Sequence, residues 1–354
     1  MRILNLIKRH FIAQGVINSL SRLLAITLSL AAIDQLLTRF GIDLLSILSA
    51  DLGHFIMICT IIMLIAELWL VDERKPVTEV RIPSHDFARS VLMYASYLKS
   101  VQKNKSVVQL RNKLTHLFHL LGLHSSREQL GKITIGSAAI LNDNLSKGEI
   151  LIDDLGWAIH LQGRSHEAAG NISKAIALLS DMEVTEEENI VRCNLALAKA
   201  YRHLAFLSPN AEMQKEHLAH CDSIISELSK NVALMKGFGQ RITCDQAQVH
   251  HARGFLIAKN IGLHLSGTVP SNDTITRDKA TQALAETKIA IRLFKQVGDL
   301  EREAKTLVLV ERLLSALHED IEALEAKARR EKIMSSSGFE GSISTIALAQ
   351  AKNA

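Results

Sequence analysis

The chain has 354 residues, of which 47% are apolar and only 4% aromatic, so leucine, isoleucine, alanine and valine must fill its core. Four prolines in the whole chain and few alternating runs of β-branched residues exclude a β-rich fold and predict an all-α protein. Four scattered cysteines without a CxxC pair exclude a disulfide framework and favour a reducing compartment.

Two apolar segments open the chain, at about residues 15–37 and 52–71. The second has the roughly 20 residues that a helix needs to cross a bilayer, and Trp69 near its end suits the headgroup layer. The first is interrupted by polar residues such as Arg22. We predict that it forms a transmembrane hairpin with the second; an interfacial amphipathic helix or a cleavable signal peptide are the alternatives.

The charges around these segments predict their orientation. Basic residues flank the outer ends of both segments, whereas the connecting loop at 39–51 has one base and two acids. The positive-inside rule then predicts a multi-pass protein of the inner membrane with both termini in the cytoplasm. Arg22 and Glu67 fall at similar depth, so they either pair with each other or reach the headgroups separately.

A basic region follows the apolar segments. Pro76 and Pro83 interrupt residues 72–84, which we predict to be a linker. Residues 84–132 carry eight bases against two acids. Plain solvation or contact with anionic lipid is favoured over nucleic-acid binding, because this region lacks a glycine-rich or aromatic recognition motif.

Helical periodicity recurs from Ser84 onward. The predicted helices cover approximately 85–103, 106–121, 126–142, 147–163, 167–181, 186–207, 211–231, 240–265, 275–297, 299–318 and 320–333. We therefore expect a cytoplasmic domain over 85–334, built as an α-solenoid of antiparallel helix pairs. Residues 335–354 are rich in Ser, Gly and Ala and are predicted to be weakly ordered.

One unit of this domain has a distinctive spacing, Gly163-x2-His166-x3-Gly170-Asn171-x3-Ala175-x3-Leu179. It resembles the tetratricopeptide (TPR) repeat. Two weaker echoes follow, at Leu197-Ala198-x2-Tyr201 and at Ala290–Phe294 with Gly298-Asp299. The resemblance implies that Gly170-Asn171 form a turn between two helices and that Ala175 and Leu179 pack against the next helix.

TPR-like proteins bind peptides or protein surfaces in a groove lined by the first helix of each unit. By that rule the candidate partner-binding residues are His160, Arg164, Asn194, Lys199, Arg202 and His203; the plain alternative for each is a polar side chain without a partner. The resemblance implies a membrane-anchored scaffold or adaptor for a protein or peptide, with its oligomeric state open. A membrane-disrupting or channel-forming effector, with the helical domain as its sensor, is the alternative.

Motifs for chemistry are absent from the sequence, which has no HExxH, GxSxG, Walker or GxGxxG pattern. His217-x2-His220-Cys221 is the best metal candidate, but zinc needs a further ligand from elsewhere. Asp153 and Asp154 are adjacent, and adjacent side chains on a helix face apart, which disfavours a shared acid–base site. We predict no enzyme, no cofactor and no bound metal.

Overall fold

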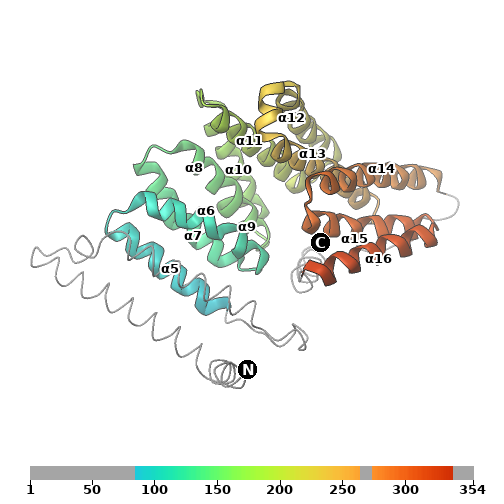
Figure 1. The fold of residues 1–354 in the computed structure, drawn as a ribbon, viewed down its shortest axis with the longest axis horizontal. Coiled ribbons are helices and arrows are strands. Elements are labelled where there is room, and N and C mark those ends of the chain that lie inside the picture. The colour runs from blue at the N-terminus through green and yellow to red at the C-terminus, as the bar shows by residue number, and fades with distance from the viewer. Residues whose placement is uncertain (1–83, 264–272, 338–354) are drawn as a thin grey trace, which may run out of the picture. The chain divides into compact units, whose positions relative to one another are not determined.

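A computed structural model describes residues 84–263 and 273–337. All of them belong to one compact unit, Val80–Ala354, and the other unit, Met1–Glu79, lies outside the described residues. Every regular element in the described ranges is helical (Figure 1), which confirms the all-α prediction. The elements are α5 (Ser84–Ser100), α6 (Asn104–Leu120), α7 (His124–Ile140), α8 (Asn144–Ile152), the π-helix η3 (Asp153–Trp157), α9 (Ala158–His160), α10 (Ser165–Ser180), α11 (Glu187–Leu207), α12 (Ala211–Lys230), α13 (Val232–Asn260), α14 (Thr274–Val297), α15 (Leu300–Ala316) and α16 (Asp320–Ser337).

Tight turns of one kind join many of these helices. A residue in the left-handed region follows the end of each preceding helix by one to three positions, and these residues are Gln102, Gly122, Asn142, Gly163, Gly298 and His318. The next backbone N–H bonds back to a carbonyl five residues earlier, as in Lys103 N to Leu98 O at 2.9 Å, which satisfies a free helix carbonyl. Gln102, Gly122 and Asn142 are spaced twenty residues apart, so a pair of helices there takes about 40 residues rather than the 34 of a TPR.

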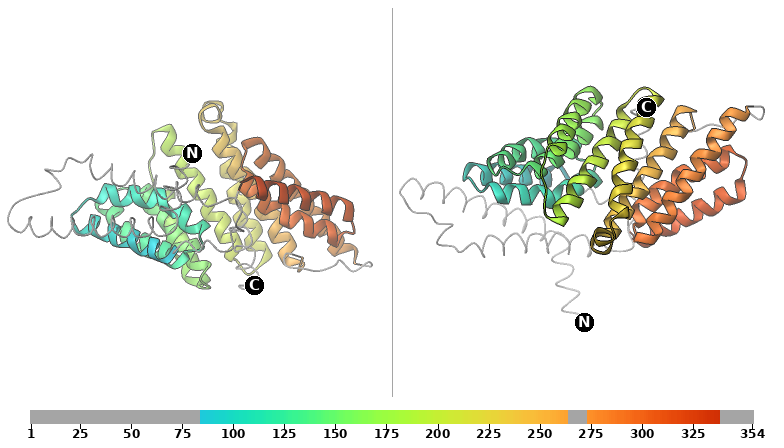
Figure 2. Two further views of the ribbon diagram at one scale, coloured as in Figure 1. Left: turned by 60° about the horizontal axis from the view of Figure 1, so that its bottom comes forward. Right: turned by 90° about the horizontal axis from the view of Figure 1, so that it is seen from above.

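The core is a series of apolar clusters along the chain. One lies among α5, α6 and α7, a second among α6 to α11, a third among α11, α12 and α13, and a fourth among α13 to α16. Neighbouring helices share these clusters, and both views of Figure 2 show α11, α12 and α13 side by side. Each helix therefore buries its apolar stripe against its chain neighbours, as expected for stacked helix pairs.

Two local predictions were wrong. The helix predicted over 240–265 starts eight residues earlier, at Val232, and α13 therefore includes Gly237 and Gly239. Gly170 and Asn171 lie inside α10, and the turn falls at Gly163, whose φ of +84° suits glycine. Ala175 and Leu179 are both buried, in an apolar cluster that also includes residues of α8 and α11.

The predicted localisation in the inner membrane is contradicted: no helix within residues 84–263 and 273–337 is long and apolar enough to cross a bilayer. The longest, α13, has 29 residues, but charged side chains such as Arg241, Asp245 and Arg253 interrupt it. The two apolar segments at about 15–37 and 52–71, and with them Arg22 and Glu67, lie outside the described residues.

Candidate partner-binding groove

A cavity of about 220 Å³ lies between α8, η3, α11, α13 and α15. Its wall consists of Glu149, Ile152, Asp153, Arg192, Leu195, Ala196, Lys199, Arg241, Cys244, Asp245, Gln248 and Arg302. We call it the charged groove, because seven of these twelve residues are ionisable acids or bases. Helices α11 and α13 contribute residues with the same spacing, 192-195-196-199 and 241-244-245-248, which places each set on a single helix face.

A buried carboxylate, that of Asp154, lies directly after the groove residue Asp153 in the chain. Asp154 is fully buried and accepts hydrogen bonds from Arg111 Nε at 2.5 Å, Arg127 Nε at 2.9 Å and Thr115 Oγ1 at 2.5 Å. Both arginines are buried as well. The cluster ties α6 and α7 to η3, because a buried carboxylate and two buried guanidinium groups are each costly without the others.

Asp153, the residue before it, faces the groove and is also held by cations. Lys199 Nζ donates to both of its carboxylate oxygens at 3.1 and 3.2 Å, and Arg111 and Arg127 each lie 3.7 Å away. Burial alone would raise the pKa of the Asp153 carboxyl, but Lys199, Arg127 and Arg111 outweigh it and lower that pKa. Asp153 and Asp154 both belong to the π-helical turn η3, and both reach these two arginines.

Further ion pairs continue across the groove. Glu149 accepts two parallel hydrogen bonds from Arg192, at 2.6 and 2.5 Å, between α8 and α11. The buried Arg202 donates to Asp245 at 3.2 Å, between α11 and α13. These pairs join helices that are not consecutive in the chain, so they hold the wall in one arrangement.

An aromatic group adjoins the charged part. Trp157 of η3 stacks on His203 with ring centroids 4.3 Å apart and meets Phe206 edge-on at 5.7 Å. Burial, reinforced by Arg202, holds the pKa of His203 well below its usual range, so this imidazole is neutral near pH 7. Through its ring contacts with His203 and Phe206, Trp157 positions η3 against α11.

The chain matches no known family model and no curated protein sequence.

The structure separates the six predicted partner-binding residues into two sets. Lys199 lines the groove, Arg202 pairs with its wall residue Asp245, and His203 packs beneath Trp157. The other three do not line it: Asn194 donates to the carbonyl of Ile190 in its own helix, and Arg164 pairs with Glu128 and Glu167. His160 hydrogen-bonds Ser165, and its ring lies 5.0 Å from that of Trp157.

Sequence reasoning missed most of the groove, although one signal was present. Arg111 and Arg127 occupy positions on the apolar stripes of α6 and α7, between core residues such as Phe118 and Leu130. Asp154 likewise interrupts an apolar stripe. Because a lone buried charge is costly, charged residues at such positions indicate that the two arginines and Asp154 pair with one another.

The basic region 84–132 is less available to a partner than its composition indicates. Arg111 and Arg127 are buried and form ion pairs with Asp154, and Lys132 pairs with Glu128 at 2.6 Å. The predicted contact of this region with anionic lipid stays a prediction.

The histidine and cysteine cluster of α12 has other contacts. His220 stacks on Tyr201 at 4.9 Å, His217 lies 6.3 Å from the same ring, and Cys221 is buried in the core. Burial raises the pKa of the Cys221 thiol to about 12, which disfavours the thiolate that binds metal.

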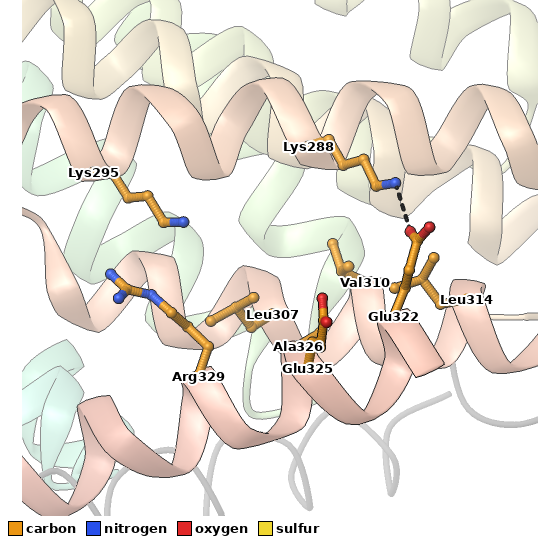
Figure 3. Close-up of a pocket in the computed structure, with 9 residues that line it drawn as sticks. All are labelled: Lys288, Lys295, Leu307, Val310, Leu314, Glu322, Glu325, Ala326 and Arg329. Carbon is orange, nitrogen blue, oxygen red and sulfur yellow. Dashed lines mark hydrogen bonds and ion pairs between the residues drawn. The ribbon is translucent and has the colours of Figure 1, made fainter. Parts of the chain in front are cut away.

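A second hollow of about 410 Å³ lies between α14, α15 and α16 (Figure 3). Its floor residues Leu307, Val310 and Leu314 are already buried, and Lys288 is paired with Glu322 at 3.2 Å. Lys295 and Arg329 both pair with Glu303. The cations of this hollow are therefore paired, whereas Arg241 of the charged groove pairs with no acid among the described residues, which makes the charged groove the stronger candidate site.

Proposed function

We propose that this chain is a helical-repeat scaffold that binds a segment of a partner protein in the charged groove. The observation that carries the proposal is the convergence of four helices, α8, α11, α13 and α15, with η3 on a single cavity whose wall is mostly polar. Stacked helix pairs present such shared faces as binding surfaces. The resemblance of residues 163–179 to a TPR unit supports the same role by analogy.

The ion pairs favour binding over chemistry. Lys199, Arg127 and Arg111 hold the pKa of Asp153 below its usual range, so this carboxylate is a poor general acid near pH 7. Both oxygens of Glu149 are occupied by hydrogen bonds from Arg192. The same pairs fix the wall before a partner arrives, which lowers the entropy cost of association. The proposal therefore assigns the groove to recognition and assigns no catalysis.

Filling the groove tests the proposal. Gln248 lines the cavity, and the Gln248→Trp substitution would occupy it. Gln282, exposed on α14 and outside both hollows, provides the matched control substitution Gln282→Trp.

Peptides of twelve random residues would be selected by display on the full chain, and their affinities measured for both variants. Selected peptides should bind the wild-type chain and Gln282→Trp alike, and bind Gln248→Trp about tenfold more weakly or worse. Equal affinity for all three proteins would contradict a groove-binding function.

A further inference from the structure

Within the charged groove, the cations lie nearer to solvent than the acids. The side-chain exposures are 27% for Arg192, 34% for Lys199 and 39% for Arg302, against 20% for Glu149, 16% for Asp153 and 17% for Asp245. An incoming ligand therefore meets ammonium and guanidinium groups first. This ordering selects for negative charge.

The charge balance points the same way. The groove residues, their ion-pair partners and Asp154, which pairs with two of those partners, comprise seven cations and five acids. They are Arg111, Arg127, Arg192, Lys199, Arg202, Arg241 and Arg302 against Glu149, Asp153, Asp154, Asp245 and Asp299. Arg241 is exposed at the groove and pairs with no acid among the described residues, so its guanidinium is available to a ligand.

Lys199 can also be shared with a ligand at small cost. Its partner Asp153 retains Arg111 and Arg127, each 3.7 Å away, when Lys199 turns to another carboxylate. Asp153 would therefore not become an unpaired buried charge, which is the usual penalty for breaking such a pair.

We infer that the partner segment bound in the charged groove is acidic, with carboxylate side chains that meet Arg241, Arg302 and Lys199 from α13, α15 and α11. This inference rests on the proposed function, because it names the chemistry of the segment which that function binds. Arginine favours such a partner, since its planar fork matches a carboxylate with two hydrogen bonds.

The test uses a fluorescein-labelled peptide of six Glu-Ala repeats and the same peptide with Gln in place of Glu. Fluorescence anisotropy with the full chain at low and at physiological salt gives the affinities. We expect the Glu peptide to bind at least about tenfold more tightly than the Gln peptide, and the preference to shrink as salt screens the charges.

The double variant Arg241→Gln/Arg302→Gln should lose about tenfold or more in affinity for the Glu peptide. Its matched control is Lys279→Gln/Lys327→Gln, which removes the same charge from exposed positions outside the groove and should change that affinity by less than about twofold. An equal loss of affinity in both double variants would show that the affinity depends only on the net charge of the protein, and would overturn the inference.

The remaining outcomes separate the inference from the proposed function. Displayed peptides that depend on the open groove but are basic or apolar would overturn the acidic inference and leave the proposed function standing. A single-stranded oligonucleotide that binds the groove more tightly than the Glu peptide would also overturn it, in favour of a nucleic-acid ligand. If no peptide distinguishes Gln248→Trp from Gln282→Trp, the proposed function itself fails.

Discussion

The buried carboxylate of Asp154 offers the sharpest test of the fold around the groove. Substitution of Asp154 by Asn keeps the side-chain volume and removes the charge that Arg111 and Arg127 share at 2.5 and 2.9 Å. Removing one partner of a buried ion pair costs about 3–5 kcal/mol. Asp153 still lies 3.7 Å from both arginines, so we expect the lower end, about 3 kcal/mol. For a domain of this size that corresponds to a fall in Tm of about 6–12 °C.

Urea denaturation of the full chain, followed by circular dichroism, measures this loss. Asp181→Asn, at an exposed position, is the matched control and should stay within about 0.5 kcal/mol of wild type. A variant that replaces Asp154, Arg111 and Arg127 together by apolar residues should regain most of the stability. If Asp154→Asn unfolds at the same urea concentration as Asp181→Asn, the buried cluster does not hold α6, α7 and η3 together.

Two further predictions concern pH and helix packing. Burial, aided by neighbouring cations, lowers the pKa of His119 to about 3 and that of His251 to about 4, below the unfolded value of about 6.5. The unfolded chain therefore binds more protons below pH 6.5, and the free energy of unfolding should fall by about 2 kcal/mol per histidine between pH 6.5 and 5. Urea midpoints at the two pH values measure this, and a His119→Leu/His251→Leu variant that keeps the full slope would contradict it. The Gly254→Ala substitution should destabilise the fold by about 1–3 kcal/mol, because the new Cβ would lie 2.9 Å from the carbonyl oxygen of Ala283. Gly237→Ala, where a Cβ meets open space, should stabilise the fold by about 0.5–1 kcal/mol. Thermal unfolding that ranks the two variants the other way would refute this packing.

Helix positions followed closely from the sequence, because apolar periodicity and turn residues act locally. Gly122 and Gly298 mark turns that any reading of helix ends would find. The start of α13 was missed because Gly237 and Gly239 are common in loops, yet packing of Leu234 into the core extends the helix through them. Tertiary burial overrode the local preference.

The groove was only partly predictable, because its chemistry arises from contacts between distant residues. Lys199 was identified from its helix face, but its partner Asp153 lies 46 residues earlier, and the π-helical turn that aims Asp153 has no sequence signature. Arg241 lies at the start of the predicted helix 240–265 and was not among the predicted partner-binding residues, because no spacing along the chain relates it to α11. Pairings of this kind follow from the fold and not from spacing along the chain.

Photo-crosslinking from within the groove tests the central claim most directly. A benzophenone amino acid would replace Gln248, with exposed Lys327 of α16 as the control position in the same full chain. The account predicts that position 248 crosslinks to one discrete segment of a partner, mapped by mass spectrometry, and that position 327 does not. Crosslinks to the same segment from both positions, or from position 327 alone, would contradict the groove as the binding site.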